Sequence, residues 1–167
     1  MKNVFYLVIV FFIPQLTFSK DTDIHFYGTL ISEPCTLSLD SEEQLIDFGP
    51  IVKSTFNNNT VAAKRNVNIT LNDCDISISK FVKFTFHGDK FSDNEELFAV
   101  TGEAKGIAIK LISEDGDNIS PDVPMSDIEL SSGTNQLNIE AMLVGYDLSK
   151  ISTGSFSSVV TFSMSYD

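Results

Sequence analysis

The side chains that could bind a metal or catalyse a reaction are few, and the two cysteines are the most informative. Cys35 and Cys74 are the only cysteines among 167 residues. Two thiolates cannot complete a zinc site unaided, and His25 and His87 show no ligand spacing with them. A nucleophilic cysteine would need a nearby base, and the sequence assigns none. An even number of cysteines in an exported chain favours a disulfide.

The remaining polar residues form no recognisable catalytic or metal-binding motif. A Ser-His-Asp triad is defined by geometry, and the sequence singles none out, so His25 and His87 are predicted to be surface or strand-end histidines. Residues 114–118 read Glu-Asp-Gly-Asp-Asn, which faintly resembles a calcium loop but lacks the spacing and closing glutamate of one. A solvated turn is therefore predicted there, and the chain is predicted to have no enzyme activity, no cofactor and no small-molecule substrate.

The N-terminus predicts export from the cytoplasm. Met-Lys-Asn is followed by an apolar run over residues 4–13, then by Pro14 and by small residues at Thr17 and Ser19. This is the pattern of a signal peptide over residues 1–19, because a membrane-spanning helix needs about 20 apolar residues. The rest has the length of one domain. The net charge of −12 gives no basic footprint for nucleic acid.

The elements that must position these residues are predicted to be strands. Apolar and polar residues alternate over 24–32, 35–39, 67–71, 82–86, 107–111, 137–143 and 160–166, and a short apolar segment covers 44–48. Short alternating segments separated by turn signals predict an all-β sandwich or barrel. Residues 93–99 are predicted to form one short helical turn.

The two ends of the mature chain carry matching strand patterns. Val160, Phe162, Met164 and Tyr166 share one face of a terminal strand, directly before Asp167. Ile24, Phe26, Gly28 and Leu30 alternate in the same way just after the signal peptide. A fold that ends on a core strand has no later strand to cover its free side. The head of one chain could therefore complete the tail of another.

Together these segments resemble a subunit of the chaperone–usher fimbriae, the surface pili of Gram-negative bacteria. The resemblance rests on the order of the signal peptide, residues 23–37 (Asp-Ile-His-Phe-Tyr-Gly-Thr-Leu-Ile-Ser-Glu-Pro-Cys-Thr-Leu), Leu71-Asn-Asp-Cys74, residues 84–88 and 106–111, and the terminal Phe162-Ser-Met-Ser-Tyr-Asp167. It covers the whole mature chain. The short head before Gly28 looks more like the minor tip or adaptor subunits than the rod subunit.

The resemblance implies an incomplete immunoglobulin-like sandwich that lacks its C-terminal seventh strand and is completed by a donor strand. Residues 20–30 would be the donor extension, with Ile24, Phe26, Gly28 and Leu30 entering a neighbour's groove, and residues 31–167 the pilin domain. Phe156, Val160, Phe162 and Met164 would line the chain's own groove, and Tyr166 with the Asp167 carboxylate would contact the chaperone. Cys35 and Cys74 match the family's disulfide positions.

The resemblance also implies the partners and the location of the chain. The partners would be a periplasmic chaperone, an outer-membrane usher and neighbouring fimbrial subunits, and the chain would pass through the periplasm to a surface fimbria. Donor-strand complementation is a known form of strand addition. The alternative function is a single-domain adhesin or secreted carbohydrate-binding module, and exposed aromatic residues on a closed sandwich would favour it. An exported enzyme is a third reading, without a catalytic set to support it.

Overall fold

The computed structural model describes residues 23–30 and 32–166, so the predicted signal peptide, residues 20–22 of the donor segment and Asp167 lie outside the described residues. The chain divides into two compact units, Met1–Ile31 and Ser32–Asp167. The described part of the first unit, residues 23–30, contains no strand. The alternation in this segment predicted an extended strand, but a strand is stabilised by hydrogen bonds to a neighbour, and these residues pair with none in the described structure.

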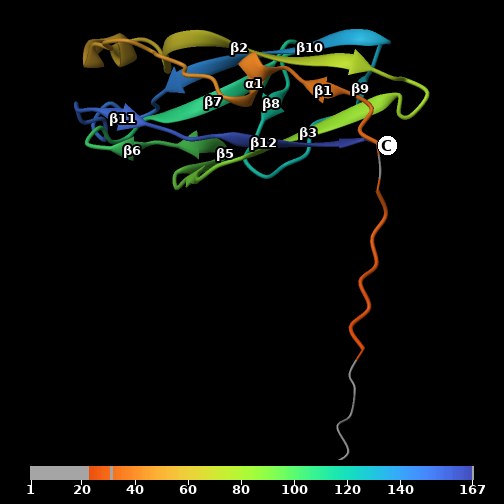
Figure 1. Cartoon of the computed structure of the whole chain (residues 1–167). Helices are drawn as coiled ribbons and strands as arrows, with labels where there is room; N and C mark the ends of the chain where they lie inside the picture. Colours follow the sequence, from red (N-terminus) through yellow and green to blue (C-terminus); the bar gives the residue numbers. More distant parts are fainter. Residues whose placement is uncertain (1–22, 31, 167) are drawn as a thin grey trace, which may run out of the picture. The chain divides into compact units, whose positions relative to one another are not determined.

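The second unit is built almost entirely of strands (Figure 1). Its one short α-helix and one 3-10 helix are α1 (Leu39–Glu42) and η1 (Lys53–Asn57). The strands are β1 (Thr36–Leu37), β2 (Val61–Cys74), β3 (Phe81–His87), β4 (Lys90–Phe91), β5 (Asn94–Ala99), β6 (Thr101–Gly102), β7 (Ala108–Ser113), β8 (Asn118–Ile119), β9 (Ile128–Glu129), β10 (Gly133–Val144), β11 (Phe156–Ser157) and β12 (Thr161–Tyr166).

The strands form two main layers, and Figure 1 shows β2 and β10 in one layer and β3 and β12 in the other. The larger sheet has the order β1-β2-β10-β7-β5-β4, with β8 paired to β7. The smaller sheet has the order β12-β3-β9, and β11 pairs with β6 in a separate ribbon. All of these pairs are antiparallel. The prediction of an all-β sandwich is confirmed.

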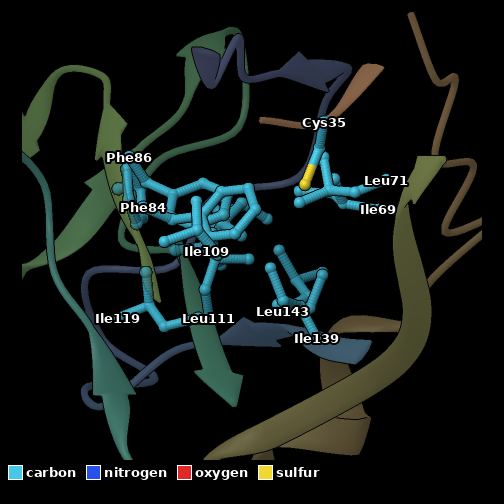
Figure 2. Close-up of a cluster of buried hydrophobic side chains, with 14 of the residues drawn as sticks. Cys35, Ile69, Leu71, Phe84, Phe86, Ile109, Leu111, Ile119, Ile139 and Leu143 are labelled. Atoms are coloured by element: carbon cyan, nitrogen blue, oxygen red, sulfur yellow. The ribbon is translucent and has the colours of Figure 1, made fainter. Parts of the chain in front are cut away.

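The core lies between the two layers. Figure 2 shows its side chains pointing toward one another, with Phe84 and Phe86 of β3 facing residues of β2, β7 and β10. The alternation read from the sequence places these residues on the inner face, because successive side chains of a strand point to opposite sides of the sheet. The buried members include Ile69, Leu71, Ile109, Leu111, Ile139 and Leu143.

Cys35 and Cys74 form the predicted disulfide. Cys35 lies just before β1 and Cys74 ends β2, the strand with which β1 pairs. Both cysteines are buried at the end of the core. The bond fastens the first segment of the second unit to its longest strand.

Three local predictions differ from the structure. Residues 94–99 form strand β5 rather than the helical turn predicted over 93–99, because Leu97 and Phe98 are buried and Phe98 pairs with Ile109 of β7. Alternation over 35–39 yields only the two-residue β1, after which the chain turns into α1 and leaves Leu39 exposed. Residues 44–48 form no strand. The turn at 114–118 is confirmed, since it joins β7 to β8.

Candidate functional site: an open apolar groove

The main concave feature of the second unit is a groove of about 1110 Å³ that opens beside β12. One wall is residues 154–164, and the opposite wall is residues 44–51, which follow α1. The floor is the inner face of the larger sheet together with Phe86 of β3. The floor residues are Val67, Ile69, Phe86, Ile109, Leu111, Ile139 and Ala141. The core of the sandwich is therefore open to the outside along this groove.

The terminal strand forms the first wall because its side chains alternate. Thr161, Ser163 and Ser165 are exposed, whereas Phe162, Met164 and Tyr166 are half-buried. The ring centroid of Phe162 lies 5.8 Å from those of both Phe84 and Phe86. Each ring pair adds dispersion and burial to the hydrogen-bonded pairing of β12 with β3. The strand is thus anchored on one side, and its apolar row is only half covered.

β12 is also an edge strand, since among the described residues it pairs with β3 alone. The N–H and C=O groups on the free side of an edge strand are available to a further strand. An apolar row and a free backbone edge side by side are what an incoming strand requires. The four groove residues predicted from the sequence, Phe156, Val160, Phe162 and Met164, all line this groove.

The second wall, residues 44–51, was not predicted. This wall forms no β-strand, and side-chain hydrogen bonds hold it to β2. Arg65 donates from Nε to the carbonyl oxygen of Asp47 and from a terminal nitrogen to that of Phe48, each at 2.8 Å, and its guanidinium lies 5.8 Å from the Phe48 ring. Gln44 Nε2 donates to the Asn68 carbonyl oxygen at 2.8 Å. The apolar segment 44–48 was the only sequence signal for this wall.

The two walls approach each other at one point. The ring centroids of Phe48 and Phe156 lie 6.4 Å apart, and both residues line the groove. Because Arg65 positions Phe48, this arginine also affects the width of the groove at that point. A substitution at Arg65 therefore acts on the groove through Phe48.

The remaining predicted site residues are those at the end of β12 and those of the donor segment. Tyr166 is half-buried at the end of β12, where burial raises the pKa of its phenol above the ordinary value and the Glu33 carboxylate adds to the shift. Asp167 lies outside the described residues. In the first unit, Ile24, Phe26 and Leu30 are exposed, and Gly28 belongs to the same segment without a strand. The roles of these residues as donor and chaperone contacts stay predictions.

His87 has partners that the sequence did not reveal. Its Nδ1 lies 2.9 Å from Asp122 Oδ1, and its Nε2 lies 3.0 Å from Ser163 Oγ. The order of atoms resembles a catalytic triad, but the cluster is exposed to solvent on the outer face of β12. Water screens such a cluster, so we read it as a polar link that joins β12, β3 and the segment before β9.

Within the described residues, no group of three or more His, Cys, Asp or Glu side chains is arranged to hold a metal ion. No described helix is long and apolar enough to cross a membrane.

Comparison with known proteins identifies the family. Residues 24–167 match the model of the family described as fimbrial protein. The chain belongs to this fimbrial family. It is 29% identical to the fimbria A protein of Serratia marcescens over 144 residues, which cover 86% of this chain and 83% of that protein. It is 30% identical to the probable major fimbrial subunit LpfA of Escherichia coli O157:H7, covering 89% of this chain and 85% of the relative.

A solved pilin has the same fold. The P pilus rod subunit PapA matches with a TM-score of 0.73 at 26% identity, covering 81% of this chain and all of that one. The fimbrial chain is therefore a structural, non-enzymatic subunit of a surface fimbria, with an incomplete immunoglobulin-like sandwich that contacts other subunits. The resemblance of its head to tip or adaptor subunits stays a prediction.

Proposed function

We propose that this subunit polymerises by donor-strand exchange. Its groove accepts a strand from a neighbouring subunit, and its own residues 20–30 enter the groove of another. The supporting observation is the groove of about 1110 Å³ beside the free edge of β12. A groove this large and apolar is unfavourable in water, and a complementary strand would bury its walls and pair with the edge.

Before assembly, a periplasmic chaperone fills the same groove and delivers the subunit to an outer-membrane usher. The half-covered row of Phe162 and Met164 is the surface that the chaperone strand covers, and Tyr166 with Asp167 lies at the end of that contact. This sequence of partners explains how an open sandwich avoids aggregation during export. The exposed side chains in residues 23–30 supply the donor that later replaces the chaperone.

A free adhesin or carbohydrate-binding module is less well supported as the main function. A closed sandwich with a cluster of exposed aromatic residues would favour that alternative. The sandwich is open along β12. Its exposed core must be covered by a partner strand whether or not the subunit also binds a receptor. Donor-strand exchange accounts for the groove and for the apolar head together.

The deciding experiment compares two adjacent substitutions in the head. Phe26 and Tyr27 are both 91% exposed and alternate along the chain, so in an extended donor only one of them faces the groove. Phe26→Asp places a carboxylate in an apolar groove, which costs several kcal/mol unless it is protonated or paired. We expect it to block insertion into a neighbour, whereas Tyr27→Asp leaves insertion nearly unchanged.

The readout is a peptide-exchange assay, in which variant peptides of residues 20–30 displace the chaperone from a chaperone–subunit complex. Capture of the full-length Phe26→Asp chain by the chaperone is measured in parallel. The proposal requires that capture is retained while exchange is lost. Equal exchange by the two variant peptides would contradict it.

A further inference from the structure

A second, smaller hollow of about 330 Å³ lies within the same unit. Its walls come from the β4–β5 hairpin, from the segment before β7 and from the loop that follows β10. The lining residues are Phe91, Asp93, Asn94, Gly106, Tyr146, Asp147 and Lys150. None of these residues lines the groove, so the hollow is a separate site.

The hollow is held in shape by contacts between distant parts of the chain. Gly106 has a φ of +74°, and a Cβ at this position would lie 2.6 Å from the Lys150 carbonyl oxygen, so only glycine permits the loop to approach this closely. The N–H of Ser152 donates to the Lys105 carbonyl oxygen at 3.2 Å and fastens the loop. Phe91 packs against a separate buried cluster that contains Leu97 and Met142.

Charged and polar groups surround the hollow. Lys150 Nζ lies 2.7 Å from Asp93 Oδ2, and this hydrogen bond lowers the pKa of Asp93 and raises that of Lys150. Asp147 Oδ1 accepts hydrogen bonds from the backbone and hydroxyl of Ser149 at 2.9 and 2.6 Å, which lowers its pKa too. Both carboxylates and the ammonium are therefore charged at neutral pH and already oriented.

The aromatic and amide groups complete the set. Tyr146 lines the hollow and is 58% exposed, so part of its side chain is accessible to a ligand. Asn94 Oδ1 accepts the N–H of Glu96 at 3.0 Å, which fixes the side chain in the β4–β5 turn and makes its NH₂ group a positioned donor. An exposed ring beside a few fixed donors and acceptors is the usual composition of a small-ligand pocket.

We propose that this hollow binds a neutral hexopyranose. The apolar face of a pyranose ring can stack on Tyr146, while its hydroxyl groups both donate and accept, matching carboxylates on one side and the Lys150 and Asn94 donors on the other. The two carboxylates outnumber the one ammonium in a chain of net charge −12, which disfavours anionic sugars. A volume near 330 Å³ suits one ring, at the small end of ligand pockets.

The test uses the mature chain, folded with its disulfide intact and with its groove filled by a peptide of residues 20–30. The probes are the methyl glycosides of mannose, galactose and glucose, with sialic acid as the anionic comparison, measured by saturation-transfer NMR. We expect at least one neutral glycoside to bind with a dissociation constant of the order of 1 mM. Tyr146→Ala should weaken it at least about tenfold, while Tyr146→Phe retains it.

Two further variants make the result specific to the hollow. Asn94→Asp keeps the acceptor for Glu96 but removes the NH₂ donor, and we expect it to lose binding. Leu39→Ala removes an exposed apolar side chain that lines neither the hollow nor the groove, and should change nothing. Absence of transfer to every neutral glycoside would overturn the proposal. So would equal binding by the parent and Tyr146→Ala chains, or tighter binding of sialic acid. These outcomes are independent of donor-strand exchange, which is read out at the groove.

Discussion

Phe162 gives the sharpest test of the groove, because its ring serves two packing interfaces. On one side it contacts Phe84 and Phe86 within the chain, and on the other it lines the groove. Truncation of a fully buried phenylalanine to alanine costs about 3–5 kcal/mol. Since the ring is half-buried in the open chain, we assign about 2 kcal/mol to the open form and a similar amount to burial under the donor strand.

Phe162→Ala should therefore weaken donor binding by about thirtyfold, because each 1.4 kcal/mol is a factor of ten. The assay is fluorescence anisotropy of a labelled peptide of residues 20–30 with a chain that begins at residue 31. Ser165→Ala is the matched control, since Ser165 lies on the same strand but on the exposed outer face. Near-ultraviolet circular dichroism shows whether each variant has kept its packing before peptide is added.

The reasoning requires a specific loss of peptide affinity. If Phe162→Ala and Ser165→Ala bind the peptide equally well, the apolar row of β12 is not the donor site. If Phe162→Ala lowers the stability of the open chain by the full 3–5 kcal/mol and leaves peptide affinity unchanged, the ring belongs to the chain's own core alone.

The remaining predictions concern the loop that borders the smaller hollow. Gly106→Ala should lower the free energy of unfolding by about 1–3 kcal/mol more than Gly116→Ala does. Both glycines have a positive φ, but only a Cβ at Gly106 would meet backbone atoms of the loop. Equal losses of stability in urea unfolding would refute the close approach at Gly106. The pKa of Asp93 in the folded chain lies below the ordinary aspartate value of 3.8. The ion pair of Asp93 and Lys150 should therefore persist from neutral pH down to 3.8, and should be lost as the pH falls through the folded-state pKa of Asp93. The NMR titration of the Asp93 carboxyl carbon measures this, and a midpoint of Asp93 above 3.8 would contradict the assignment.

Much of the fold is encoded locally. Alternation with period two places residues on one face of a strand without any knowledge of the partner, so the inner faces of β2, β3, β7, β10 and β12 could be read from the chain. The disulfide followed from the even number of cysteines together with the export signal. Alternation placed Phe162 and Met164 on one face of a strand, and the resemblance to fimbrial subunits implied that this face borders a groove, which both residues line in the structure.

The features that join distant segments of the chain were decided only by the tertiary structure. Residues 94–99 form β5 because burial of Phe98 against β7 outweighed the local preference for a turn. The second wall of the groove exists because Arg65 holds the Phe48 backbone across 17 positions of sequence. The smaller hollow exists because Gly106 lets the loop at Lys150 come close. Local periodicity carries no information about such contacts, since they depend on which surfaces meet once the sheets have packed.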